Sequence, residues 1–271
     1  PDVSAPGLRE RLWQVAASRC LRAIAYIVAF SSIATTIAGW QFKAIAKAGI
    51  PDTDALTAYF GSFNMIAGVA SLALQVMLTG PVLRAAGVGV ALFIVPVAMA
   101  GASAAVLVLG SLAAVSALKA SDQVLRYSID KSTVELLYLP LSATETFRAK
   151  SFIDTVVYRA GDAIGGVAVM ICATGLGLAP AAMTWVTLIA VAAWLGAAVV
   201  ARREYVTHLQ DSIRQHRLDA EHAGGGLLDR SATQALADKL KGTPDEILYA
   251  LSFFESTGRA LNLMTALGVA D

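Results

Sequence analysis

Three ionisable residues, Lys119, Asp122 and Arg126, lie three and four positions apart at the end of a long apolar stretch. On a helix this spacing brings their side chains onto one face, where Asp122 can pair with both cations. An arginine side chain can also hold a phosphate group through two parallel hydrogen bonds. The spacing therefore predicts an ion-paired cluster whose cations have the chemistry to bind an anion.

Other ionisable residues also interrupt apolar sequence. Asp154, Arg159 and Asp162 form one group, in which Arg159 and Asp162 are three positions apart and can pair within a helix. Lys43 lies in "WQFKAIA", near the end of another apolar stretch. Ionisable side chains inside a membrane span are costly and are a functional hypothesis by default. A second interpretation stays open, in which these residues neutralise one another and anchor helix ends at the membrane interface.

The composition indicates that these residues belong to a membrane protein. Of the 271 residues, 56% are hydrophobic and only 15% are charged, whereas soluble domains have about 25% charged residues. The mean hydropathy is +0.63, and a net charge of +1 gives no argument for nucleic-acid binding. The two cysteines, Cys20 and Cys172, are far apart at apolar positions, so we expect neither a disulfide framework nor a metal site.

Stretches without charged residues predict the helices that position the ionisable groups. A helix needs about 20 apolar residues to cross the hydrocarbon core. The charge-free stretches are 23–42, 55–83, 85–118 and 163–201. The third is too long for one span, and the fourth is broken at "GLGLAP", so each predicts two helices. We therefore expect an all-α, polytopic membrane protein with a six-helix bundle over residues 20–203.

The distribution of basic residues favours six crossings over five. With six, one side of the membrane holds most of them, namely Arg9, Arg11, Arg19, Arg22, Arg84, Arg126, Lys131, Arg148, Lys150, Arg202 and Arg203. The other side holds Lys43 and Lys47, and with five crossings this bias vanishes. Because cytoplasmic loops are enriched in Lys and Arg, we expect both ends in the cytoplasm, with residues 1–19 as a cytoplasmic segment.

The composition changes after Arg203. Residues 204–226 are charged and end in three glycines, which predicts a solvated helix followed by a hinge. Residues 227–271 hold two amphipathic helical patterns separated by "GTPDE" and resemble one HEAT-like repeat, a helix pair that stacks on neighbours and binds protein partners. A simple helical hairpin docked on the bundle is the alternative. Since the sequence begins without Met and stops abruptly, we expect a fragment of a longer protein.

Three segments resemble the bacterial and plastid ATP:ADP antiporters. "RYSIDKSTVELLYLPL" is similar to that family's K-Y-S-x-x-D-x-T-K-E-x-x-Y-I-P-L, and "RAKSFIDTVVYRAGDAIGG" is similar to its K-x-K-A-x-I-D-V-V-x-x-R-x-G-K-S-G-G. "WQFKAIA" resembles the end of the first span in the family's C-terminal half. The matching residues of the first two are Tyr127, Ser128, Thr133, Glu135, Tyr138, Pro140, Leu141, Lys150, Ile153, Asp154, Val156, Arg159, Gly161, Gly165 and Gly166. The resemblance implies the C-terminal six-helix half of a fold related to the major facilitator superfamily.

The sequence departs from this family at two basic positions. Gln123 stands where a lysine is expected, and Asp162 replaces the lysine of G-K-S-G-G. Two cations that could meet phosphates are absent, so the resemblance implies the family's fold more strongly than exchange of ATP for ADP.

We expect a secondary carrier of an anionic solute, nucleotide-like solutes included, with six substrate-binding candidates: Lys43, Lys119, Asp122, Arg126, Arg159 and Asp162. The resemblance adds Glu135, Lys150 and Asp154 as gate or structural residues, and it implies the inner (plasma) membrane of a bacterium. The distribution of basic residues places Ser128 to Glu135 on the cytoplasmic side, where we expect a capped turn. Because such carriers pair two bundles, an N-terminal six-helix half or a second copy is the expected partner.

The alternative is a non-transporting scaffold that anchors a HEAT-repeat domain in the membrane. We expect no enzyme activity, cofactor or metal, because the sequence has no His–Glu metal motif, no Ser–His pairing in the spans and no P-loop.

Overall fold

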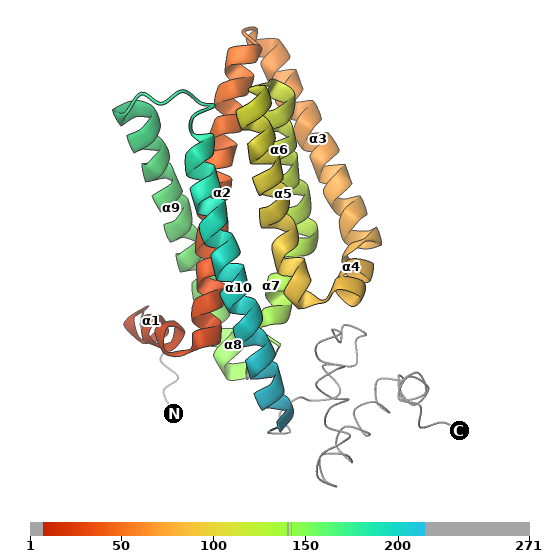
Figure 1. Ribbon diagram of the computed structural model, residues 1–271, viewed down its shortest axis with the longest axis vertical. Coiled ribbons are helices and arrows are strands. Elements are labelled where there is room, and N and C mark those ends of the chain that lie inside the picture. Colours follow the sequence, from red (N-terminus) through yellow and green to blue (C-terminus); the bar gives the residue numbers. More distant parts are fainter. Residues whose placement is uncertain (1–7, 140, 142, 215–271) are drawn as a thin grey trace, which may run out of the picture.

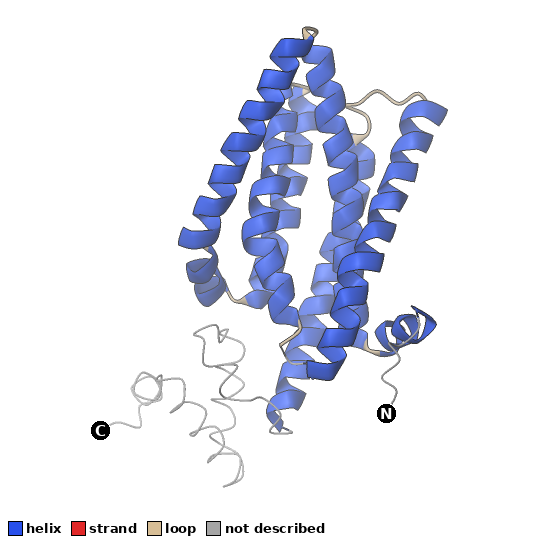
Figure 2. Ribbon diagram, turned by 180° about the vertical axis from the view of Figure 1, so that it is seen from behind, coloured by secondary structure: helices blue, strands red, loops and turns tan. Residues whose placement is uncertain are grey.

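The computed structural model describes residues 8–139, 141 and 143–214, and all its regular elements are helices (Figure 2). The predicted all-α class is confirmed for this part of the chain. The last helix runs to Arg214, so it includes the start of the predicted charged helix at 204–226. The rest of that segment, its glycine hinge and the predicted HEAT-like pair at 227–271 lie outside the described residues.

Five helical segments are long and apolar enough to cross a membrane, and this indicates a membrane protein. They are α2 (Arg19–Gly49), α3 (Thr53–Met77), α5 (Val88–Leu109), the segment Ala149–Gly175 and the apolar part of α10 (Thr184–Arg214). The Ala149–Gly175 segment is composite and includes the end of α8 (Ala143–Phe152), η2 (Ile153–Val157), α9 (Tyr158–Val169) and η3 (Met170–Gly175). Figure 1 shows these long helices side by side.

A further helical rod lies among the five. It consists of α6 (Leu112–Leu125), η1 (Arg126–Asp130) and α7 (Lys131–Leu137), and it packs against α2, α3 and α5. Stretch 85–118 thus holds two helices, as predicted. They separate at Gly110, whose φ of 56° lies in the left-handed region that glycine adopts without strain.

Two sequence predictions about helix ends are wrong. Ser128 to Glu135 is not a turn but part of the rod, because its hydroxyls bond carbonyls within the helix instead of capping a turn. Ser132 Oγ donates to Ser128 O at 3.0 Å, and Thr133 Oγ1 donates to Ile129 O at 2.7 Å. The second charge-free stretch also holds two helices, since α3 ends at Met77 and α4 (Thr79–Ala86) has Pro81 in its first turn, where a missing N–H is tolerated.

Helix α2 is the centre of the packing. In its most apolar stretch 56% of the residues are buried, against 11% for α3 and 17% for Ala149–Gly175. It contacts α6, α9 and α10 along its length, and Figure 1 shows it between α9 and the α5–α6 pair. Side chains near the middle of α2 therefore face three neighbouring helices.

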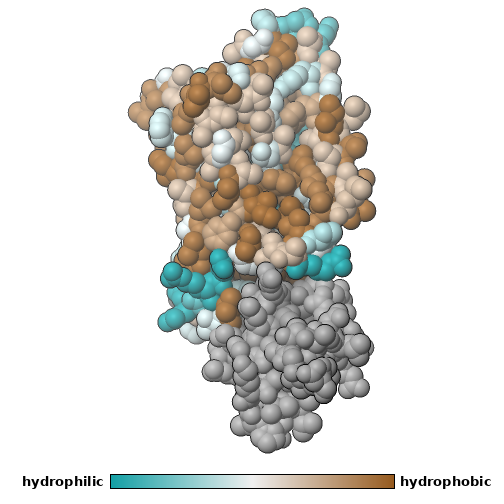
Figure 3. Space-filling view, turned by 45° about the vertical axis from the view of Figure 1, so that its right-hand side comes forward, coloured by the Kyte–Doolittle hydropathy of each residue, from teal (hydrophilic) through white to brown (hydrophobic). Residues whose placement is uncertain are grey.

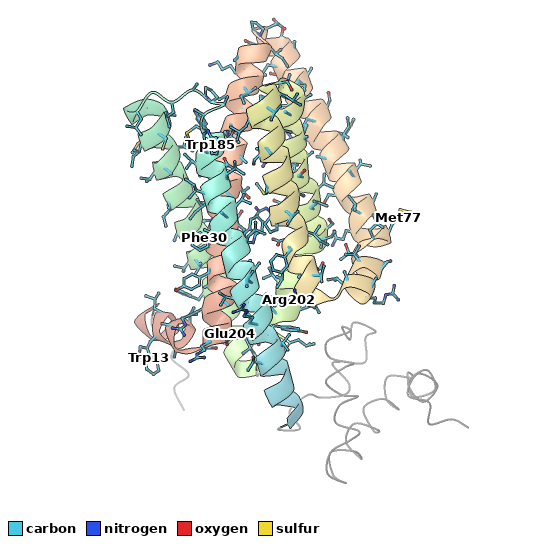
Figure 4. All side chains as sticks on the ribbon, viewed as in Figure 1. Trp13, Phe30, Met77, Trp185, Arg202 and Glu204 are labelled. Carbon is cyan, nitrogen blue, oxygen red and sulfur yellow. The ribbon has the colours of Figure 1, made fainter. Side chains whose placement is uncertain are left out.

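On the face that Figure 3 shows, the body of the molecule is largely apolar, and hydrophilic residues gather at its upper end and in a band near its lower end. Exposed basic residues at the ends of the helices include Arg19, Arg22, Arg202 and Arg203. Figure 4 shows Arg202 and Glu204 at the opposite end of α10 from Trp185. The short helix α1 (Leu8–Ala17) lies at the lower end, beside the start of α2 (Figure 1).

Candidate functional site at the middle of α2

The site is organised by four hydroxyl side chains in "SSIATT", near the middle of α2. Ser31 and Thr35 form one pair four residues apart, and Ser32 and Thr36 form a second pair beside it. Residues four apart lie on the same face of a helix, so the two pairs make two adjacent polar rows. One row faces α6, and the other faces α9.

The first row contacts an ionic cluster, which we define as Lys119, Asp122 and Arg126. The Asp122 carboxylate accepts hydrogen bonds from Lys119 Nζ at 2.9 Å and from Arg126 Nε at 2.9 Å. It also accepts one from Thr35 Oγ1 at 2.8 Å. The Arg126 guanidinium donates to Ser31 O at 3.2 Å and to Thr35 Oγ1. The predicted pairing of Asp122 with both cations is confirmed.

Burial makes this cluster costly to disturb. Asp122 is 1% exposed and Arg126 is 9% exposed. The Arg126 guanidinium carbon lies 5.7 Å from the centre of the Trp194 ring, within the range of a cation–π contact. Since both cations already bond Asp122, a bound anion would have to compete with that carboxylate. Arg126 is also the first residue of η1, a π-helix, and such segments occur frequently at functional sites.

The second row, Ser32 and Thr36, contacts Tyr158 and Asp162 of α9, and we define these four residues as the hydroxyl–carboxylate cluster. Asp162 Oδ1 accepts hydrogen bonds from Ser32 Oγ at 2.6 Å and from Thr36 Oγ1 at 3.0 Å. Ser32 Oγ also lies 2.9 Å from the backbone oxygen of Tyr158, to which it can donate. The predicted Arg159–Asp162 pair is present but long, at 3.6 Å, and the Arg159 side chain is 78% exposed.

Two glycines bring α9 close enough to α2 for these hydrogen bonds. A Cβ atom at Gly161 would lie 2.7 Å from Ala29 O, and one at Gly165 would lie 2.9 Å from Thr36 Cβ. Real Cβ atoms essentially never approach other heavy atoms this closely. The Gly-x-x-x-Gly spacing thus permits the close helix contact typical of membrane proteins.

Both clusters lie near the middle of the candidate spans. Asp162 is the middle residue of Ala149–Gly175, and the four hydroxyl residues surround the midpoint of α2. In many secondary transporters the sites for substrate and coupling ion lie near the bilayer midplane, where helices are locally irregular. The π-helical segments η1 and η2 adjoin the two clusters, at Arg126 and directly before Tyr158.

The candidate gate residues lie apart from these clusters, toward the basic end. Lys150 Nζ pairs with Glu135, and both side chains are partly exposed. Lys150 Nζ also lies 6.0 Å from the centre of the Tyr138 ring. Burial raises the pKa of the Tyr138 phenol, whose hydroxyl has no hydrogen-bond partner within the described part of the chain. Asp154 is exposed in η2.

Lys43 is the predicted site residue that the structure does not bring to either cluster. It is exposed, eight residues beyond Thr35 on α2, which is about 12 Å along a helix. A separate polar contact lies on the same part of α2, where Gln41 bonds Thr184, Thr187 and the Pro180 carbonyl, and it joins α2 to α10.

The hydroxyl rows were missed by the sequence predictions, although "SSIATT" within an otherwise apolar stretch is a visible signal. The described residues contain no group of three His, Cys, Asp or Glu side chains placed to hold a metal ion. In comparisons with known proteins, no family model, curated protein or solved structure matches the chain. The resemblance to ATP:ADP antiporters therefore stays a prediction.

Proposed function

We propose that this chain is the membrane bundle of a secondary carrier for an anionic solute, with nucleotides among the candidates. The observation that supports this is the ionic cluster of Lys119, Asp122 and Arg126, in which Asp122 and Arg126 are buried against the middle of α2 and Arg126 begins a π-helix. A largely buried set of two cations and one carboxylate is costly in a membrane and is a functional hypothesis by default. The sequence resemblance to nucleotide carriers points in the same direction.

The proposed mechanism is competition between the solute and Asp122. An anion that enters the cluster takes hydrogen bonds from Arg126 and Lys119 and releases Asp122, which keeps its bond from Thr35 on α2. Because Arg126 also bonds Ser31 and Thr35, its movement changes the contact between α6 and α2. Solute binding would thereby shift the equilibrium between two arrangements of these helices, as alternating access requires.

In this proposal the α6–η1–α7 rod is a sixth crossing. It packs against three of the five apolar segments, and the charges of Lys119, Asp122 and Arg126 pair within the protein instead of facing lipid. Six crossings put both ends of the bundle on the side that holds Arg19, Arg202 and Arg203, which we take as cytoplasmic. The carrier is completed by a second bundle, either an N-terminal six-helix half or a second copy of this chain.

Uptake by the purified protein in proteoliposomes tests the proposal, with radiolabelled ATP, ADP and inorganic phosphate as probes. We expect uptake of at least one probe to fall about tenfold or more in Arg126→Gln and Lys119→Gln, since each removes a direct anion partner. Arg159→Ala tests the exposed arginine that pairs with Asp162 of the hydroxyl–carboxylate cluster. Arg203→Gln, an exposed basic residue distant from the clusters, is the matched control and should keep wild-type uptake.

A second candidate function, a non-transporting membrane scaffold, is favoured by one specific observation. Both cations of the ionic cluster already bond Asp122, so the cluster is complete without a solute. In this case the bundle anchors the HEAT-like segment, which binds a protein partner. Absence of uptake for all three probes, or uptake that is unchanged in Arg126→Gln and Lys119→Gln, would reject the role of these cations in transport and favour the scaffold.

A further inference from the structure

The two carboxylates that face the hydroxyl rows of α2 differ in how their charge is balanced. Asp122 has two cations within 2.9 Å and is almost fully buried. Asp162 has Arg159 at 3.6 Å, and that arginine is 78% exposed. The close partners of Asp162 Oδ1 are the uncharged hydroxyls of Ser32 and Thr36. A carboxylate in the middle of a candidate span with so little compensation calls for a cation.

The polar groups next to Asp162 Oδ1 all offer oxygen atoms that can coordinate a cation. One carboxylate, two hydroxyls and the backbone carbonyl of Tyr158 are linked by oxygen–oxygen distances of 2.6, 2.9 and 3.0 Å. Hard cations prefer carboxylate, carbonyl and hydroxyl oxygens, and a site with one formal charge suits a monovalent ion. The Gly161 and Gly165 contacts hold the two helices at this short separation.

We propose that Asp162, Ser32, Thr36 and the Tyr158 carbonyl bind a sodium ion between α2 and α9. The ion replaces the two hydroxyl-to-carboxylate hydrogen bonds with four oxygen–metal contacts. Its position at mid-span beside η2 matches the way that irregular backbone and carbonyl oxygens hold coupling ions in secondary transporters. Its role as the coupling ion rests on the proposed carrier function, whereas its binding does not.

Arg159 is the competitor for this site. Its guanidinium approaches Asp162 Oδ2, while the hydroxyls approach Oδ1. Because the Arg159 side chain is largely exposed, it can move away when the ion enters. The proposal therefore makes a prediction that a simple hydrogen-bonded contact between helices does not make, namely that removal of Arg159 strengthens sodium binding.

Binding of ²²Na⁺ to the purified full chain in detergent tests the proposal at constant ionic strength, with choline as the replacement cation. Asp162→Asn should lower the affinity about tenfold or more, because it removes the charged ligand. Thr36→Val, which removes one hydroxyl and keeps the shape of the side chain, should lower it by a smaller factor. Arg159→Gln should raise it. Asp54→Asn, which changes an exposed acid in the first turn of α3, outside the cluster, is the matched control and should bind as the wild type does.

Three results would overturn the site: no saturable ²²Na⁺ binding by the wild type, equal binding by wild type and Asp162→Asn, or weaker binding by Arg159→Gln. Helical content and elution as a single species are checked for each variant, and Thr36→Val replaces Asp162→Asn if the latter does not fold. Sodium binding without uptake of any solute would reject the carrier and keep the ion site. Solute uptake without sodium binding would reject the ion site alone.

Discussion

Substitution of Gly161 by alanine tests whether α9 is held against α2 as closely as the structure shows. The added Cβ would lie 2.7 Å from Ala29 O and 2.9 Å from Ser32 Cβ, and the first distance is 0.7 Å short of the 3.4 Å at which contact becomes ordinary. Neither neighbour is the end of a flexible side chain, so the helices must separate. Separation also lengthens the Ser32 and Thr36 hydrogen bonds to Asp162.

The expected cost follows from these two effects. Overpacking of this kind costs about 1–3 kcal/mol, and each weakened hydrogen bond between membrane helices adds about 0.6 kcal/mol. Alanine is a better helix former than glycine by about 1 kcal/mol, and this gain offsets part of the loss. We therefore expect Gly161→Ala to lower the free energy of unfolding by about 1–3 kcal/mol.

Gly166→Ala is the matched control, because Gly166 lies on the same helix and a Cβ there would meet nothing within 4 Å. It has the same gain in helix propensity without the clash, so it should be as stable as the wild type or more stable. Unfolding in mixed micelles of increasing SDS content, followed by circular dichroism, measures both variants. Equal stability of Gly161→Ala and Gly166→Ala, within about 0.5 kcal/mol, would refute the close contact.

Three further substitutions use the same unfolding assay. Asp122→Asn should cost about 3–5 kcal/mol, because it removes the carboxylate that Lys119 and the buried Arg126 share. Arg126→Gln should cost less, because Lys119 still balances Asp122, and the reverse order would contradict the pairing. Tyr138→Phe should keep or raise stability, since it removes a buried hydroxyl that has no hydrogen-bond partner among the described residues. A loss of more than about 1 kcal/mol would show that this hydroxyl does form a hydrogen bond.

The sequence predicts the helices better than their ends. The length of each stretch without charged residues locates the apolar helices, because a helix that crosses a membrane needs a minimum number of consecutive apolar residues. It also indicates correctly that 85–118 holds two helices, which the structure separates at Gly110. Hydroxyl-rich sequence misled the prediction at Ser128 to Glu135, since serine and threonine side chains can serve a cap or bond a carbonyl inside a helix. Periodicity does not distinguish these two uses.

Spacing along one helix predicted the ion pairs of Asp122 and of Asp162, which are local, but not the contacts between helices. The Lys119–Asp122–Arg126 pairing is a local i, i+3 and i, i+4 arrangement, and the structure confirms it. The partners that α2 supplies, Thr35 and Ser32, are separated from these acids by about 90 residues or more along the chain, and helix packing alone brings them together. The same limit explains why Lys43 was grouped with a site that it does not reach.

The π-helical segment η1 fixes the rotational register between the two halves of its rod. In a π-helix each hydrogen bond spans one residue more than in an α-helix. The wider turn thus accommodates one extra residue, and α7 keeps nearly the orientation that a continuous α-helix one residue shorter would give it. If the same residues formed a continuous α-helix instead, α7 would turn by about 100° relative to α6. Glu135 would then face away from Lys150, although neither residue had changed.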